Sequence, residues 1–169
     1  MPIVDEKDNI IEYKDRYDRD PKDIFRITHV WIFNKKNQFL IAKRHHSKKV
    51  SPNKWSPAVV GTVEEGETYE SNAKKEAEEE LGLKNLDMKP LFKRYYENSN
   101  GRRFCYVFIA SMDMSEGDFV LEEDEVAEVK WVGLGELAEW YKKSPEDFIP
   151  SMGQTIDLVK EYKNHANQN

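Results

Sequence analysis

The sequence predicts an α/β (α+β) fold in which a mixed β-sheet is sandwiched between helices. Segments rich in β-branched and aromatic residues, such as RITHVWIF at residues 26–33, alternate with turn residues, as strands do. Other segments place apolar residues three and four positions apart, as helices do. The chain has 169 residues, of which 38% are hydrophobic. This is enough for one packed core, so both kinds of element are expected in one domain.

The strands are predicted from short apolar runs bounded by turns. The NKKNQ segment turns one strand back on the next, which makes a hairpin. Residues 15–23 are expected to form a loop or a short helix. Residues 51–57 hold two prolines and an asparagine, which predicts an exposed loop. A turn is expected at residues 98–101. In chain order, strands are expected at residues 10–13, 26–33, 39–43, 58–60, 89–96, 104–111 and 130–132.

Three helices are predicted, and the first has a clear start and end. Thr68 is a suitable N-cap for a helix over residues 69–81, and Gly82 is a suitable stop. Residues 135–143 and 154–163 have amphipathic patterns. Without a repeat, a low-complexity linker or a Gly/Ser-rich break, residues 1–169 are expected to form a single domain.

Charge and composition exclude several classes of protein. The formal net charge is −6, so binding to duplex nucleic acid through its phosphates is not expected. Cys105 is the single cysteine, which excludes an intramolecular disulfide. The sequence has no run of about 18 apolar residues, so no membrane span is expected. The charged N-terminus does not resemble a signal peptide, and a cytoplasmic protein is the expectation.

The glutamates of the first helix are not equivalent. At roughly 100° per residue, Glu80 falls inside the apolar stripe and Glu76 lies at its edge. Glu79 lies on the same flank, slightly further out, and Glu78 points the opposite way. Three carboxylates are therefore expected on one half-buried flank. Like charges four residues apart, next to the negative end of a helix, destabilise the helix unless a cation neutralises them.

These oxygen ligands suit Mg²⁺ or Mn²⁺. The alternative is a solvated glutamate face balanced by Lys74 and Lys75, each four residues before a glutamate. That alternative explains Glu78, but it does not explain a glutamate within the apolar stripe at Glu80. The pattern therefore favours a divalent metal site.

Residues 61–83, GTVEEGETYESNAKKEAEEELGL, resemble the Nudix box, G-x5-E-x7-R-E-U-x-E-E-x-G-U, where U is a bulky aliphatic residue. Lys75 replaces the arginine of the pattern, and Ala77 is a small residue at a U position. The resemblance implies metal ligation by Glu76, Glu79 and Glu80. It also implies that Glu67 and Lys75 hold the loop and helix together. The matching residues are Gly61, Glu67, Glu76, Glu79, Glu80, Gly82 and Leu83.

The resemblance implies a magnesium-dependent hydrolase that cleaves a diphosphate linkage in a small molecule, such as a nucleoside diphosphate derivative. The resemblance allows the general base to lie either in the box, with Glu79 as the candidate, or in a later acidic loop. That loop offers Glu122, Glu123 and Glu125. The alternative for the loop is a solvated acidic run without a catalytic role.

Basic residues are needed for the phosphate charge. Lys43 and Arg44 end a predicted strand, and Arg103 begins another. Because side chains alternate along a strand, at most one of Lys43 and Arg44 is expected to face the substrate.

The wider segment resembles the branch of the family that contains isopentenyl-diphosphate isomerases and related hydrolases. The isomerases of this branch use a cysteine just before the box glycine, a histidine just after it, and glutamates on a later strand. Here these positions hold Val59-Val60, Thr62 and residues 101–103, so a hydrolase is favoured. An isomerase is the alternative, and a catalytically silent Nudix-fold binding module is the third. The resemblance also allows for a homodimer.

Overall fold

The computed structural model describes residues 1–98 and 101–166, with side chains described as far as residue 163. Within these residues, nine strands form one mixed sheet. The strands are β1 (Pro2–Val4), β2 (Ile10–Tyr13), β3 (Ile24–Phe33), β4 (Gln38–Arg44), β5 (Trp55–Pro57), β6 (Val59–Thr62), β7 (Met88–Asn98), β8 (Gly101–Ser111) and β9 (Val126–Gly133). The helices are α1 (Tyr69–Leu81), α2 (Leu134–Lys143) and α3 (Met152–Ala166), with short 3-10 turns at Glu116–Asp118 and Pro145–Asp147.

The ten-residue strand β3 is the centre of the sheet. It pairs in parallel with β8 along its whole length. On its other edge it pairs antiparallel with β1, then β6, then β4. β9 extends the sheet by pairing with β4, and β7 by pairing with β8. Because β3 is covered on both edges and both faces, its side chains are nearly all buried.

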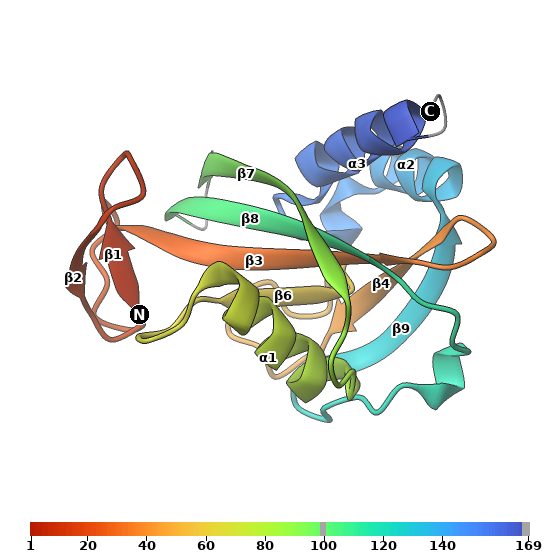
Figure 1. The fold of residues 1–169 in the computed structure, drawn as a ribbon, viewed down its shortest axis with the longest axis horizontal. Helices are drawn as coiled ribbons and strands as arrows, with labels where there is room; N and C mark the ends of the chain where they lie inside the picture. The colour runs from red at the N-terminus through yellow and green to blue at the C-terminus, as the bar shows by residue number, and fades with distance from the viewer. Residues whose placement is uncertain (99–100, 167–169) are drawn as a thin grey trace.

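Helices cover both faces of this sheet, which confirms the predicted sandwich. Alternate residues of β3 point to opposite sides: Val30 packs in the cluster that contains Ala73 and Ala77 of α1. Trp31 packs in the other cluster, with Leu137 of α2 and residues of α3. Figure 1 shows α1 on one side of the sheet and α2 and α3 together on the other.

Helix α1 begins and ends where the sequence predicts. The Thr68 hydroxyl accepts a hydrogen bond from the Ser71 backbone N–H, and the Ser71 hydroxyl accepts one from the Thr68 backbone N–H. Gly82 adopts the left-handed conformation, with φ of 70°. Glycine reaches this conformation without steric cost, so it ends the helix.

The structure corrects one expectation and resolves another. Residues 51–57 are not wholly an exposed loop, because β5 occupies Trp55–Pro57, is buried and pairs with β4. Trp55 packs in the core beneath α2, and this burial outweighs the local loop signal of the prolines. Residues 15–23 form turns without a helix. Two residues of the predicted turn, Ser99 and Asn100, lie outside the described residues.

In the described part of the chain, no helix is long and apolar enough to span a membrane.

Candidate functional site

Gly61, at the end of β6, sets how closely α1 approaches the sheet. A Cβ at this position would lie 2.5 Å from Asn72 Oδ1 and 2.5 Å from Glu76 Cγ. It would also lie 2.9 Å from Thr28 Oγ1 on β3. Real side chains do not approach this closely, so only glycine lets the middle of α1 rest against β3 and β6.

Lys75 connects the box loop to α1 through contacts with three carboxylates. Its Nζ lies 2.7 Å from Glu67 Oε1, 3.4 Å from Glu64 Oε2 and 3.9 Å from Glu76 Oε1. Burial lowers the pKa of Lys75, but the hydrogen bond to Glu67 and the charges of these carboxylates outweigh burial and raise it. The lysine therefore links the loop to the helix through a single ammonium group, without the bidentate hydrogen bonding that an arginine would allow.

Asn72 completes this link from one turn earlier in the helix. It is fully buried, and its Nδ2 donates to Glu67 Oε2 at 2.9 Å and to Glu76 Oε1 at 3.2 Å. Its Oδ1 accepts a hydrogen bond of 2.6 Å from the Thr28 hydroxyl. Asn72 therefore orients Glu67 and Glu76 at once and anchors both to the central strand.

Glu80 and Glu76 are carboxylates in an unfavourable environment for charge. Glu80 is 7% exposed, and burial is the main cause that raises its pKa to about 8. The charge of Glu76 raises it further, whereas Arg44 and Lys48 oppose the shift. Burial likewise raises the pKa of Glu76 to about 7, against the opposing effect of Lys75. A cation placed here would relieve both groups.

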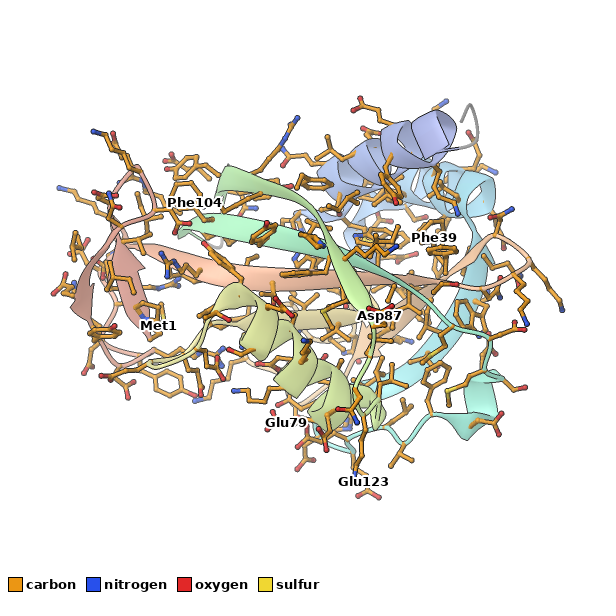
Figure 2. All side chains as sticks on the ribbon, viewed as in Figure 1. Met1, Phe39, Glu79, Asp87, Phe104 and Glu123 are labelled. Carbon is orange, nitrogen blue, oxygen red and sulfur yellow. The ribbon has the colours of Figure 1, made fainter. Side chains whose placement is uncertain are left out.

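Glu79 does not lie on a half-buried flank, contrary to the expectation. It is exposed, as is Glu78. The reason is geometric: Glu79 is about 100° around the helix from Glu80, which is enough to leave the packed stripe. The charge of Glu79 still raises the pKa of Glu76, one turn away, so the two carboxylates are close enough to interact electrostatically. Figure 2 shows Glu79 at the C-terminal half of α1.

Arg44 lies beside the buried glutamates. It lines a small cavity with Glu80 and Glu125. Lys48, from the loop after β4, forms an ion pair with Glu125. Arg44 makes a hydrogen bond of 3.1 Å to the Val50 carbonyl, but it forms no ion pair within the described residues. Two cations and two carboxylates therefore meet around this cavity.

The structure distinguishes between the acidic residues of the later loop. Glu125 is half-buried and lines the cavity with Glu80. Glu122 and Glu123 are exposed, and Figure 2 shows Glu123 at the surface below the end of α1. The backbone N–H of Glu122 donates to the Glu80 carbonyl at 3.2 Å, which fixes the loop to the helix end.

Two of the three predicted substrate-binding cations lie elsewhere. Lys43 points to the other face of the sheet, where its Nζ lies 5.7 Å from the centroid of the Trp55 ring. Arg103 is also on that face, in line with Cys105 along β8, and is 5% exposed. It donates a hydrogen bond of 2.7 Å to Asn98 Oδ1. The structure therefore does not bring Lys43 or Arg103 to the glutamates of α1.

Sequence reasoning missed Asn72 and Lys48 as parts of this region. Only the spacing of Asn72, four residues before Glu76, gave a signal for it. Lys48 reaches the site because the loop after β4 folds towards it, and no local pattern marks it.

Comparison with known proteins identifies the family. The chain matches the family model described as the NUDIX domain over residues 24–152, which includes every glutamate discussed above. This chain belongs to the Nudix family.

Two relatives have sequences that align with most of this chain. An uncharacterised Nudix hydrolase of Listeria monocytogenes is 32% identical over 133 residues, 77% of this chain and 75% of its own length. An isopentenyl-diphosphate Delta-isomerase of Klebsiella pneumoniae is 29% identical over 128 residues, 72% of this chain and 68% of its own length.

Solved structures show the same fold. A Deinococcus radiodurans protein superposes with a TM-score of 0.77 at 23% identity, covering 92% of this chain and 96% of the other. The NUDIX domain of Shewanella oneidensis NrtR, solved as a complex with ADP ribose, has a TM-score of 0.65 at 16% identity. It covers 86% of this chain and 94% of the other.

Nudix proteins generally depend on a divalent metal ion, and the residues here can be tested against that requirement. No group of three His, Cys, Asp or Glu residues in the described part of the chain is gathered to hold a metal ion. Mg²⁺, however, is commonly held by one or two carboxylates together with substrate phosphates. Glu80 is buried and Glu76 is half-buried, and the surroundings of both disfavour a negative charge on their oxygen atoms. They fit such an ion.

Proposed function

We propose that this Nudix protein is a Mg²⁺- or Mn²⁺-dependent hydrolase that cleaves the diphosphate linkage of a nucleoside diphosphate derivative or a related small molecule. The observation that carries the proposal is the pair of carboxylates formed by the buried Glu80 and the half-buried Glu76, with Arg44 and Lys48 beside Glu80. A carboxylate pair in this environment suits a divalent cation, and neighbouring cations suit phosphate oxygens.

The side chains have separate roles in this proposal. Glu76 and Glu80 hold the metal, with Glu79 supplying a third oxygen from the exposed side. When bound, the metal neutralises phosphate charge and makes water a better nucleophile. Arg44 binds a phosphate oxygen. Gly61, Glu67, Lys75 and Gly82 hold the box loop and the helix in place.

Glu125 is the favoured general base among the later glutamates. It lines the same cavity as Glu80, whereas Glu123 is exposed on the outer loop. It forms an ion pair with Lys48, and a carboxylate in this position can accept a proton from water. Glu79 is the alternative base within the box, because it is exposed and adjacent to Glu76.

The isomerase alternative has less support, although an isomerase is among the relatives. Cys105 is fully buried in the core beneath α2 and α3. Burial raises the pKa of its thiol, which disfavours the reactive thiolate. Thr62 stands where the isomerases of this family have a histidine. No cysteine is therefore available beside the box for proton transfer to a double bond.

The test is product analysis by ³¹P NMR, with Mg²⁺ or Mn²⁺, on ADP-ribose, dinucleoside polyphosphates, nucleoside triphosphates and isopentenyl diphosphate. A hydrolase releases a monophosphate or inorganic phosphate from at least one of them. An isomerised allylic diphosphate identifies an isomerase instead, and the absence of any product identifies a binding module.

Glu80→Gln is expected to lower kcat at least 100-fold on the substrate so found, because the amide cannot neutralise a divalent cation. Glu79→Gln is also expected to reduce turnover. Glu78→Gln is the matched control on the exposed side of the same helix, and it should retain activity. Equal losses in all three variants would contradict the assignment of roles.

A further inference from the structure

A cleft opens between the N-terminal segment and the box loop. It has a volume of about 570 Å³. Tyr13, Asp15 and Arg16 line one side, and Thr62, Glu64 and Glu65 line the other. Figure 1 shows why the two segments meet: the N-terminus lies next to the loop that leads into α1. The cleft thus borders the same loop that positions the glutamates.

The segment that carries Arg16 also contacts the loop after β4. The ammonium of Lys49 lies 4.3 Å from the centroid of the Tyr17 ring, a cation–π contact. Tyr17 follows Arg16, and Lys49 follows Lys48. The contact therefore brings the neighbourhood of Arg16 against the loop that supplies Lys48 to the glutamate cavity.

The electrostatic effect of Arg16 on Arg44 and Lys48 agrees with a position of Arg16 near the loop after β4. Burial lowers the pKa of Arg44 and of Lys48, and the positive charge of Arg16 lowers each further. Arg16, which lines the cleft, is therefore close enough to Arg44 and Lys48 for its charge to act on both. These three positive charges act on one another, and two of them act on Glu80, which favours the binding of a polyanion here.

Arg16 has no partner of its own within the described residues. It is exposed and makes no ion pair or hydrogen bond there, in contrast to its neighbours. Lys14 also lines the cleft, but its ammonium is 2.9 Å from both carboxylate oxygens of Asp23 and is paired there. The guanidinium of Arg19 lies 4.0 Å from the centroid of the Phe25 ring. Of these three basic residues, Arg16 is the one whose donors are available to a ligand.

The walls of the cleft favour a neutral, hydroxyl-bearing group. Within the described residues, the Thr62 hydroxyl and the Glu65 carboxylate make no hydrogen bond or ion pair. Carboxylates accept hydrogen bonds from hydroxyl groups, and they repel an additional phosphate. An apolar chain would desolvate them without replacing their hydrogen bonds, which costs free energy. Tyr13 adds an aromatic face next to these polar groups.

We propose that Arg16 is a substrate-binding residue for the diphosphate, and that the cleft beside it holds a hydroxyl-bearing group, such as a sugar, attached to that diphosphate. This inference rests on the proposed function, because it extends the same site. It predicts a preference for sugar-linked diphosphates over nucleoside triphosphates and prenyl diphosphates.

The experiment measures binding by calorimetry with Mg²⁺, so that it does not depend on turnover. The probes are the α,β-methylene analogues of ADP-ribose and of ADP; the ADP analogue lacks the second sugar and has one more ionisable phosphate oxygen in its place. The wild type is expected to bind the ADP-ribose analogue at least tenfold more tightly than the ADP analogue. Isopentenyl diphosphate, as a third probe, is expected to bind more weakly than both.

Two variants separate the parts of the proposal. Arg16→Ala is expected to weaken both nucleotide analogues about tenfold, whereas Arg16→Lys, which keeps the charge, should lose less. Glu65→Ala should weaken only the ADP-ribose analogue. Lys36→Ala is the control, because it removes one positive charge, as Arg16→Ala does, but from the exposed β3–β4 turn. This variant should bind both analogues as the wild type does.

Each outcome decides one claim. If Arg16→Ala binds as Lys36→Ala does, Arg16 has no role in binding, even where the wild type hydrolyses diphosphates. If the ADP analogue binds as tightly as the ADP-ribose analogue, or isopentenyl diphosphate binds most tightly, the assignment of the cleft is wrong. If binding follows the expectation but no diphosphate is hydrolysed, the proposed hydrolase activity fails and this inference stands. Binding of neither analogue by the wild type overturns the inference.

Discussion

Glu80 lies in the stripe of α1 that also carries Ala73, Ala77 and Leu81, all of them buried. The helix period puts a carboxylate where packing favours an apolar side chain. No ion pair within the described residues compensates for its burial. Folding therefore buries a carboxyl group at a position where it is stable only when it is protonated or when a cation is bound to it.

The pH dependence of stability in the metal-free protein should reveal this conflict. The pKa of Glu80 is about 8 in the folded chain, against an ordinary value of 4.5. Between these values the unfolded chain has lost a proton that the folded chain retains, so the free energy of unfolding falls as pH rises. One such group gives a slope of up to about 1.4 kcal/mol per pH unit. Urea denaturation from pH 5 to pH 9 in EDTA measures it.

Glu80→Gln is expected to flatten this slope above pH 7, where Glu76 has already ionised, whereas Glu78→Gln should keep it. Mg²⁺ should stabilise the wild type more at pH 8 than at pH 6, because the carboxylates it binds are then charged. A wild-type curve that rises with pH would show that Glu80 is not buried in its uncharged form.

At the scale of elements, the site depends on how α1 docks on the sheet. Gly61 permits the close approach, Asn72 connects the helix to Thr28 on β3, and Lys75 connects it to the box loop. The loop after β8 is fixed to the other end of the helix by hydrogen bonds to Leu81 and Glu80 carbonyls. The carboxylates are thus held by contacts at both ends of one short helix.

Gly61→Ala should displace α1. The added methyl group would overlap Asn72 and Glu76, so we expect a loss of about 1–3 kcal/mol in stability. For a chain of this size, that lowers Tm by roughly 2–10 °C. Thermal denaturation followed by circular dichroism measures it, and Mg²⁺-dependent stabilisation should fall as well.

The matched control is Gly135→Ala in α2, where an added Cβ meets nothing within 4 Å. Alanine favours helix there, so no loss of stability is expected. If both variants behaved as the wild type does, the helix would not be as tightly docked as the structure shows.

At the scale of the whole molecule, β3 connects all parts of the fold. It pairs with β1, β4, β6 and β8, and the helices on both faces pack on its side chains. The N-terminal hairpin is joined to the rest by Asp8, whose carboxylate contacts Arg26 at 2.7 Å and Lys93 at 2.6 Å. Tyr69 of α1 donates to the same carboxylate.

We therefore expect the chain to unfold as a single domain. Differential scanning calorimetry should give one transition, with calorimetric and van't Hoff enthalpies that agree. Far- and near-ultraviolet circular dichroism should report the same midpoint. A separate early transition, as from independent melting of β1 and β2, would contradict this expectation.

The sequence by itself determined the features that depend on neighbouring residues. The bounds of α1 follow from Thr68, Gly82 and the period of the apolar residues, and all three act within a few positions of the chain. The inward position of Glu80 follows from the same period. The family followed from the box, because its spacing is itself the geometry of one loop and one helix.

Only the tertiary structure decided which distant residues meet these glutamates. Glu125 and Lys48 are 77 positions apart, yet they form an ion pair beside Glu80, whereas Arg103 is directed into the opposite core. Burial of Trp55 turned an expected loop into β5, and the fold of the N-terminal segment brought Arg16 to the cleft beside the box loop. Such contacts depend on how strands pair and which face each side chain takes, and a local pattern contains neither.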